Sequence, residues 1–179
     1  EEPPPAELAA LMQATHGDPF AVLGPHQVGD HVVLRTLLPD ALAVTVIDAA
    51  GQPLAELARQ DDSALFTGAL PPGTTRQAHR LRVRWASGHS SELVDPYAFP
   101  PLIHDLDVWL LAEGRHHRPY EWLGAHPIVV DGVAGTRFAV WAPAARRVSV
   151  VGSFNNWDGR RHMMRLRVEC GTWEIFIPH

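Results

Sequence analysis

The chain has 179 residues, of which 46% are hydrophobic and 20% charged, the composition of a globular rather than a disordered protein. Its formal net charge is −5 and its arginines are scattered, so it lacks the basic patch that nucleic acid or an anionic membrane would require. A single cysteine, Cys170, excludes an internal disulfide framework, and no apolar run reaches membrane-spanning length. We therefore expect a cytoplasmic protein with neither nucleic acid nor a membrane as partner.

The first half of the sequence predicts one short helix followed by a β-sandwich. Leu8, Leu11 and Met12 fall on one face of a helix over residues 6–14. The later segments are rich in Val and Leu and are separated by turn-forming residues. Strands are expected at residues 31–37, 43–48, 64–70, 79–85 and 90–94. Short strands at regular spacing are typical of a β-sandwich.

The second half repeats the plan of the first. Residues 95–101, Asp-Pro-Tyr-Ala-Phe-Pro-Pro, make a stiff crossing that closes the first unit. Residues 107–113 then stay ambiguous between helix and strand. A set of residues recurs one hundred positions later: Leu11, His16, Pro19, Leu23, Gly24 and His26 as Leu111, His116, Pro119, Leu123, Gly124 and His126. The sequence therefore predicts an all-β fold of two tandem immunoglobulin-like sandwiches, a first domain over 1–104 and a second over 105–179.

The second copy stops earlier in the plan than the first. The first copy continues beyond residues 71–73 with the expected strand at 79–85, whereas the second ends at His179. An open sandwich with an unpaired edge is a liability. We therefore expect the second domain to be incomplete at its C-terminus and the chain to be part of something longer.

Residues 147–159, Arg-Val-Ser-Val-Val-Gly-Ser-Phe-Asn-Asn-Trp-Asp-Gly, hold the candidate site. Val148 and Val150 alternate with polar residues, which predicts a strand before a turn rich in Gly, Asn and Asp. Phe154 and Trp157 lie inside this polar turn. An indole can stack on a sugar ring while neighbouring amides and carboxylates bind the hydroxyls. The alternative is that Trp157 folds back onto the core.

No catalytic residue, metal ligand or cofactor site is expected. The acidic pairs Asp61–Asp62 and Asp105/Asp107 lie in an expected turn and at the domain junction, where solvated or capping roles are the ordinary ones. The histidines do not have the paired spacing of a zinc site. Because some of them repeat with the fold, we expect them to bond to the backbone of turns.

A resemblance covers nearly the whole chain. Residues 138–162 and the segments Met164–Arg167 and Gly171–Pro178 resemble the starch- and glycogen-binding module of bacterial 1,4-α-glucan branching enzymes. Residues 16–26 and 95–99 resemble the extra N-terminal domain of the longer members. The resemblance implies a glycosyltransferase of glycogen biosynthesis whose α-amylase-type barrel, absent here, forms α-1,6 branches. This portion is then expected to bind or position α-glucan and to influence the length of the transferred chain.

The resemblance also implies the site residues and the partners. Trp157 is the implied sugar-stacking platform, with Asn155, Asn156 and Asp158 as hydroxyl partners by position. The implied partners are α-glucans, such as glycogen and maltooligosaccharides, and the catalytic barrel of the same polypeptide. In the first domain the matching residues 49–53 hold no aromatic, which favours a spacer or packing role.

Two alternatives stay open. The chain could be the N-terminal region of a related debranching or trehalose-forming enzyme, or a non-enzymatic scaffold that binds a protein. An exposed indole flanked by amides favours sugar, and a broad apolar patch favours protein. The remaining aromatic and aliphatic strand residues are expected in the core: Trp173, Ile175 and Ile177, and Phe138, Val140 and Trp141.

Overall fold

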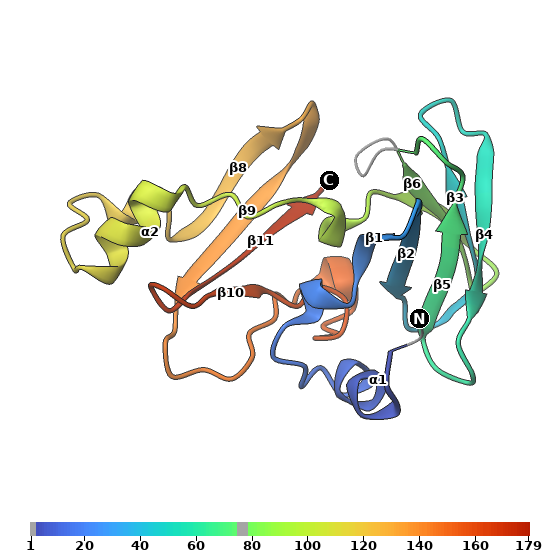
Figure 1. Ribbon diagram of the computed structural model, residues 1–179, viewed down its shortest axis with the longest axis horizontal. Coiled ribbons are helices and arrows are strands. Elements are labelled where there is room, and N and C mark those ends of the chain that lie inside the picture. The colour runs from blue at the N-terminus through green and yellow to red at the C-terminus, as the bar shows by residue number, and fades with distance from the viewer. Residues whose placement is uncertain (1–2, 75–78) are drawn as a thin grey trace.

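Two antiparallel β-sheets lie side by side in a computed structural model that describes residues 3–74 and 79–179 (Figure 1). The predicted all-β class is confirmed. The first half contains α1 (Pro5–Met12), η1 (Pro19–Ala21), β1 (Gly24–Val28), β2 (His31–Leu37), β3 (Ala41–Ile47), β4 (Pro53–Arg59), β5 (Leu65–Leu70), β6 (Arg80–Trp85), β7 (Ser90–Leu93) and η2 (Pro96–Ala98). The second half contains α2 (Asp105–Ala112), η3 (Pro119–Glu121), β8 (Gly124–Val130), β9 (Val133–Trp141), η4 (Ser153–Asn155), β10 (Arg165–Arg167) and β11 (Thr172–Pro178).

The first sheet has seven strands in the order β1-β2-β5-β4-β3-β6-β7. Strand β4 pairs with β3 through its first part and with β5 through Ala58 and Arg59, so it forms the corner at which the sheet folds over. Alternation places Leu81 and Val83 of β6 inside and its arginines outside. The enclosed core is formed by residues from both layers: Leu34, Leu38, Ala41, Val44, Val46, Leu57, Phe66, Leu70, Leu81 and Val83.

Every strand predicted in the first half forms, but β1 and β4 were not predicted. Strand β1 contains a proline and few apolar residues, and four of the seven residues of β4, one Pro, one Glu and two Ala, are of types depleted in strands. Both owe their conformation to pairing with neighbours, β1 with β2 and β4 with β3 and β5. Tertiary pairing therefore overrides weak local propensity here.

The second sheet has the order β10-β11-β9-β8. Strand β11 is buried on both of its faces. Trp173, Ile175 and Ile177 share one core cluster, as predicted, and the opposite face carries Glu174 and Phe176. The ring of Phe176 packs edge-on against Phe99 of the crossing segment, with centroids 4.8 Å apart.

Two expectations for the second half are wrong. Residues 147–151 do not form a strand: Ser149 makes one isolated bridge with Met163, and backbone bonds join Val148 to Met164 and Val150 to His162. Within the described residues the ladder has this one bridge only, which is too short for a strand. Val140 and Trp141 are exposed rather than buried. The core cluster that contains Val108 of α2 includes Ala139 of β9 but neither of these two residues.

The internal repeat is seen in the order of the elements, since α1–η1–β1–β2 is followed in the second half by α2–η3–β8–β9. The repeating histidines bond to turn backbone, as expected. His16 and His116 each accept through Nδ1 from the amide two residues on, at 3.0 and 3.1 Å. His26 and His126 each donate through Nε2 to the carbonyl three residues before, at 3.0 and 2.8 Å.

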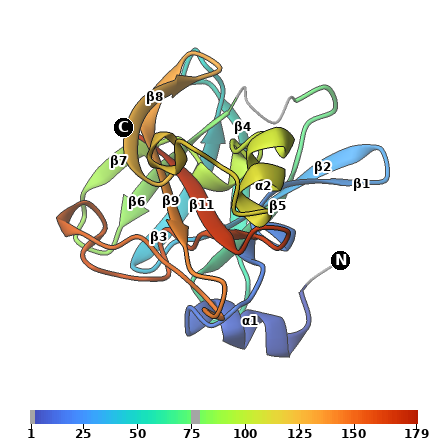
Figure 2. The same cartoon turned by 90° about the vertical axis from the view of Figure 1, so that its left-hand side faces the viewer.

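The two halves are joined by side chains as well as by the crossing segment. The hydroxyl of Tyr97 accepts from the amide of Met163 at 2.9 Å and donates to the carbonyl of Arg161 at 3.3 Å. Met163 itself lies in the core cluster of α1. The view along the long axis from the α2 side places α1 below the sheets (Figure 2).

The chain directly after the crossing segment is fixed to the second half through the backbone of Leu102 and Ile103. The buried carboxylate of Glu174 accepts from the amides of Leu102 and Ile103, and Arg167 donates to the carbonyl of Ile103 at 2.7 Å. Ile103 belongs to the core cluster that contains Val108 of α2. Leu102 and Ile103 therefore pack with the second domain.

Candidate functional site

The loop between Val151 and Met163 is organised around a buried amide. Asn155 is 1% exposed. Its Oδ1 accepts from the amide of Gly152 at 2.9 Å, and its Nδ2 donates to the carbonyl of Val150 at 2.8 Å. The same nitrogen lies 3.0 Å from Nδ1 of His162. The side chain of Asn155 thus holds the loop together from inside.

His162 completes this arrangement as a neutral ring. Desolvation, with a further contribution from the charge of Arg161, lowers its pKa to about 4. The ring is therefore neutral at pH 7, and Nδ1 can accept from the amide of Asn155 when the proton is on Nε2. The loop is consequently held by uncharged groups.

The chain turns sharply where the candidate platform lies. After the short turn η4, Asn156 and Trp157 both have left-handed backbone, with φ of 55° and 58°. The amide of Trp157 donates to the carbonyl of Gly152 at 2.9 Å, which closes the turn. A Cβ on Gly152 would lie 2.6 Å from the ring of Phe154, so a larger residue there would displace that exposed ring.

This turn presents aromatic side chains to solvent. The side chain of Trp157 is 70% exposed, and Phe154 and Asn156 are also exposed. The indole therefore does not fold back onto the core. An exposed indole beside an exposed amide is the arrangement that favours a sugar over an apolar protein surface.

Asp158 is held by an arginine of the same loop. Its carboxylate receives two hydrogen bonds from Nε and one from Nη2 of Arg160, at 2.7–3.2 Å, and one from the Arg160 amide at 2.9 Å. These hydrogen bonds, led by the side-chain ones, lower the pKa of Asp158. The group is a half-buried, ionised acceptor with a fixed orientation.

The loop borders a cleft of 690 Å³ between the two halves of the chain. Phe154, Asn156 and Asp158 line one side. Trp85 and Glu92 line the other side, and the guanidinium of Arg161 lies over the Trp85 ring at 5.0 Å. Sequence reasoning missed Trp85, because no local pattern links a strand end in the first half to a loop in the second.

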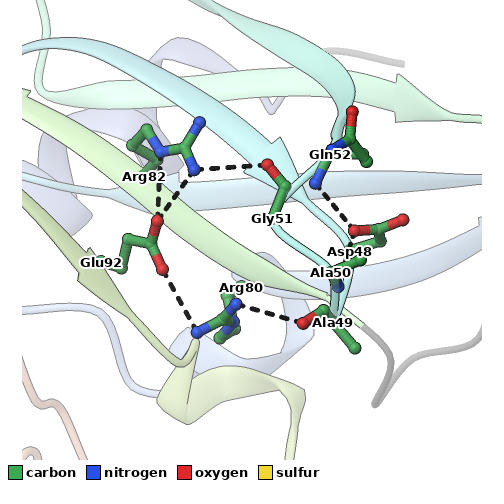
Figure 3. Close-up of polar contacts among 8 residues, drawn as sticks. All are labelled: Asp48, Ala49, Ala50, Gly51, Gln52, Arg80, Arg82 and Glu92. Carbon is green, nitrogen blue, oxygen red and sulfur yellow. Dashed lines mark hydrogen bonds and ion pairs between the residues drawn. The ribbon is translucent and has the colours of Figure 1, made fainter.

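The corresponding turn of the first half is built differently (Figure 3). Residues 48–52 form a tight turn in which the Asp48 carboxylate accepts from the amides of Ala50 and Gln52. Arg80 and Arg82 of β6 donate to carbonyls of this turn and pair with Glu92. It carries no aromatic, so its chemistry differs from that of the loop at 152–162.

Other kinds of site are not seen in residues 3–74 and 79–179. No group of three His, Cys, Asp or Glu side chains in these ranges is arranged to hold a metal ion. The helices described there are all too short or too polar to cross a bilayer.

Comparison with known proteins gives matches to both halves. Residues 4–97 match the family described as alpha-1,4-glucan branching enzyme GlgB, N-terminal domain. Residues 122–179 match carbohydrate-binding module 48, the isoamylase N-terminal domain. A protein of Rubrobacter xylanophilus named 1,4-alpha-glucan branching enzyme GlgB is 54% identical over 171 residues, which are 96% of this chain and 23% of that protein. The chain thus spans less than a quarter of this relative.

Solved structures give weaker likenesses. A pullulanase from Paenibacillus barengoltzii in complex with maltohexaose and alpha-cyclodextrin is 18% identical, with a TM-score of 0.35, over 68% of this chain and 19% of that one. The catalytic module of the pneumococcal virulence factor SpuA is 17% identical, with a TM-score of 0.33, over 51% and 14%. Scores this low carry no argument about this chain.

Proposed function

Since the chain belongs to the family of N-terminal domains of alpha-1,4-glucan branching enzymes, we propose that it is the non-catalytic N-terminal part of such an enzyme. The whole enzyme transfers a segment of α-1,4-glucan to a 6-hydroxyl and so forms α-1,6 branches in glycogen, in the cytoplasm. That chemistry requires paired carboxylates beside the scissile bond, which an α-amylase-type barrel beyond this chain supplies. This part binds α-glucan and holds it for the barrel.

The observation that carries the proposal is the exposed indole of Trp157 on a loop held rigidly from inside. In this proposal Trp157 stacks on a glucose ring, and Asn156 and Asp158 bind its hydroxyls. Asn155 serves the site by shaping the loop, because its amide is already bonded there. A loop that is ordered in advance loses less entropy when it binds.

The proposal is tested by titrating the chain with maltoheptaose in a calorimeter, with Trp157→Ala as the variant. We expect saturable binding by the chain and at least tenfold weaker binding by the variant, about 1.4 kcal/mol. Trp141→Ala is the matched control, since Trp141 is 62% exposed but lies at the end of β9, outside the loop.

Two results would count against the site. Equal affinity of Trp157→Ala and the unsubstituted chain would remove Trp157 from the site. Equal weakening by Trp141→Ala would mean that exposed indoles in general, and not this loop, contribute the binding. Thermal unfolding of both variants verifies that they remain folded.

A further inference from the structure

The helix α2 and the turn η3 carry large exposed side chains at the end of the molecule away from the first sheet (Figure 1). Trp109 is 52% exposed and Tyr120 is 63% exposed, and Leu106 is exposed one helical turn before Trp109. We call Leu106, Trp109, Gly114, Tyr120 and Gly124 the α2–η3 surface. Large apolar side chains gathered on consecutive elements mark an interaction surface.

The first copy of the repeat shows how the equivalent surface is used. Phe20 stands where Tyr120 stands in the second copy. Its ring packs edge-on against Tyr97 at 4.9 Å between centroids, and the guanidinium of Arg165 lies 3.8 Å above it. The chain that follows the first copy thus covers this ring from two places.

The end of the helix is covered in the same way. Arg147 donates to the carbonyls of Gln13 and Ala14, at 3.4 and 3.0 Å. The corresponding residues after α2 are Glu113 and Gly114, and the backbone turns identically there, since Ala14 and Gly114 have φ of 53° and 66°. Carbonyls at the C-terminal end of a helix attract cations.

The two equivalent glycines differ in what they contact. A Cβ on Gly24 would lie 2.5 Å from the carbonyl oxygen of Tyr97, so this backbone packs directly on the glycine. On Gly124 the nearest atom to such a Cβ is Nε2 of His126, at 3.8 Å. Both glycines have left-handed φ, 89° and 98°, so the backbone conformation is repeated. Among residues 3–74 and 79–179, no segment covers Gly124 as Tyr97 covers Gly24.

We propose that the polypeptide that follows His179 covers the α2–η3 surface and repeats the contacts made on the first copy. This inference rests on the proposed function, in which the chain continues into a catalytic barrel. One part of that polypeptide packs its backbone on Gly124, as residues 96–98 pack on Gly24. Other parts place one guanidinium over Tyr120, as Arg165 lies over Phe20, and a second against the carbonyls of Glu113 and Gly114, as Arg147 bonds those at the end of α1.

The contact proposed on Leu106 and Trp109 has no counterpart on α1 and follows from the exposed apolar area of these two side chains. Leu106 and Trp109 replace Ala6 and Ala9 of α1, and both alanines are exposed. Leucine and tryptophan three positions apart lie on one helix face. The occupant therefore buries more apolar area on α2 than the second domain buries on α1.

The test is hydroxyl-radical footprinting read by mass spectrometry, on this chain and on the same chain extended to the full length of the enzyme. Each residue is compared with itself in the two proteins. We expect the oxidation rates of Trp109 and Tyr120 to fall several-fold in the extended protein. Trp157 is the internal control, because a glucan platform remains open to solvent when the barrel is present.

Unchanged oxidation of Trp109 and Tyr120 in the extended protein would overturn the proposal. So would protection in the short chain that grows with protein concentration, since the occupant would then be a second copy. Protection that appears in the extended protein at every concentration supports it. If Trp157→Ala leaves maltoheptaose binding intact while this protection is found, the glucan site fails and the docking surface stands.

Discussion

Asp95 is a carboxyl group whose protonation is coupled to folding. It caps η2 by accepting from the amide of Tyr97 at 3.0 Å, and it is fully buried. Desolvation raises its pKa to about 7. An unfolded aspartate titrates near pH 3.9, so the folded chain binds the proton more tightly. The contribution of Asp95 to stability is therefore greatest at low pH and is lost as the pH rises from about 4 to about 7.

We predict that Asp95→Asn stabilises the chain at pH 7.5 by on the order of 2 kcal/mol and has little effect at pH 4.5. The amide oxygen can still accept from Tyr97, and no charge is buried. The measurement is the melting temperature of both proteins between pH 4.5 and 8. The titration of His162, which removes stability as the pH falls from about 6.5 toward 4, is common to both and cancels. Parallel pH curves would contradict the prediction.

Asn155 and Asn156 offer a paired test of the loop. We predict that Asn155→Ala lowers stability by about 1–3 kcal/mol, because the amide of Gly152 and the ring of His162 lose their partner. Asn156→Gly, which keeps the left-handed backbone accessible, should leave the melting temperature nearly unchanged and weaken maltoheptaose binding. Denaturant unfolding and calorimetric titration of each variant separate the two effects. A thermally neutral Asn155→Ala would show that the buried amide does not hold the loop.

For single residues, the sequence was enough to predict that Trp157 lies in a polar turn. It also predicted that the repeating histidines bond to the backbone of turns. It could not separate the roles of Asn155 and Asn156, which are neighbours of the same type. Their difference comes from the left-handed backbone at Asn156, which turns one amide inward and leaves the other exposed. Site assignment within a turn depends on backbone conformation that composition does not specify.

At the level of helices and strands, Gly24 and Gly124 occupy equivalent positions at the starts of β1 and β8. The second therefore serves as a matched control for steric crowding at the first. We predict that Gly24→Ala destabilises the chain by about 1–3 kcal/mol more than Gly124→Ala. The cost of left-handed φ is shared by both positions, so the difference reports the close approach of the Tyr97 carbonyl to Gly24. Chemical denaturation of the two variants gives the comparison. Equal losses of stability would mean that the crossing segment moves aside without cost.

The internal repeat of the sequence was the most informative signal for predicting the helices and strands. It predicted that the second half uses the plan of the first, and the order of the elements follows it. Periodicity failed for residues 147–151, where alternating valines predict a strand. A strand requires a partner along its length, and this segment pairs through one isolated bridge. The pattern shows which faces are apolar, and pairing decides whether a strand forms.

For the whole molecule, the boundary between the domains affects how the proposed full-length enzyme can be truncated. We predict that removing the residues before Pro101 from the full-length enzyme leaves turnover intact and changes the length of the transferred chains. Removing those before Asp105 should cost about 1–3 kcal/mol of further stability, because the buried carboxylate of Glu174 loses the amides of Leu102 and Ile103. Melting temperatures and debranched chain-length profiles of both truncations are the measurements.

Loss of turnover in an enzyme that starts at Pro101 and remains folded would contradict the proposed role of the first domain. Equal melting temperatures of the two truncations would mean that residues 101–104 contribute nothing to the second domain. The sequence indicated this crossing from its prolines. Its attachment to Glu174 could not be predicted, because the partners lie 71 and 72 residues apart in the chain.

The backbone at Trp157 shows what the exposed indole costs the fold. A bulky residue with φ of 58° is in a conformation that glycine adopts freely, and such strain costs on the order of 1–3 kcal/mol. Substitution by glycine would relieve that strain and remove the indole together. A screen for thermostability alone would therefore select against the proposed glucan platform. If Trp157 binds glucan as proposed, selection for heat resistance and selection for binding act on this position in opposite directions.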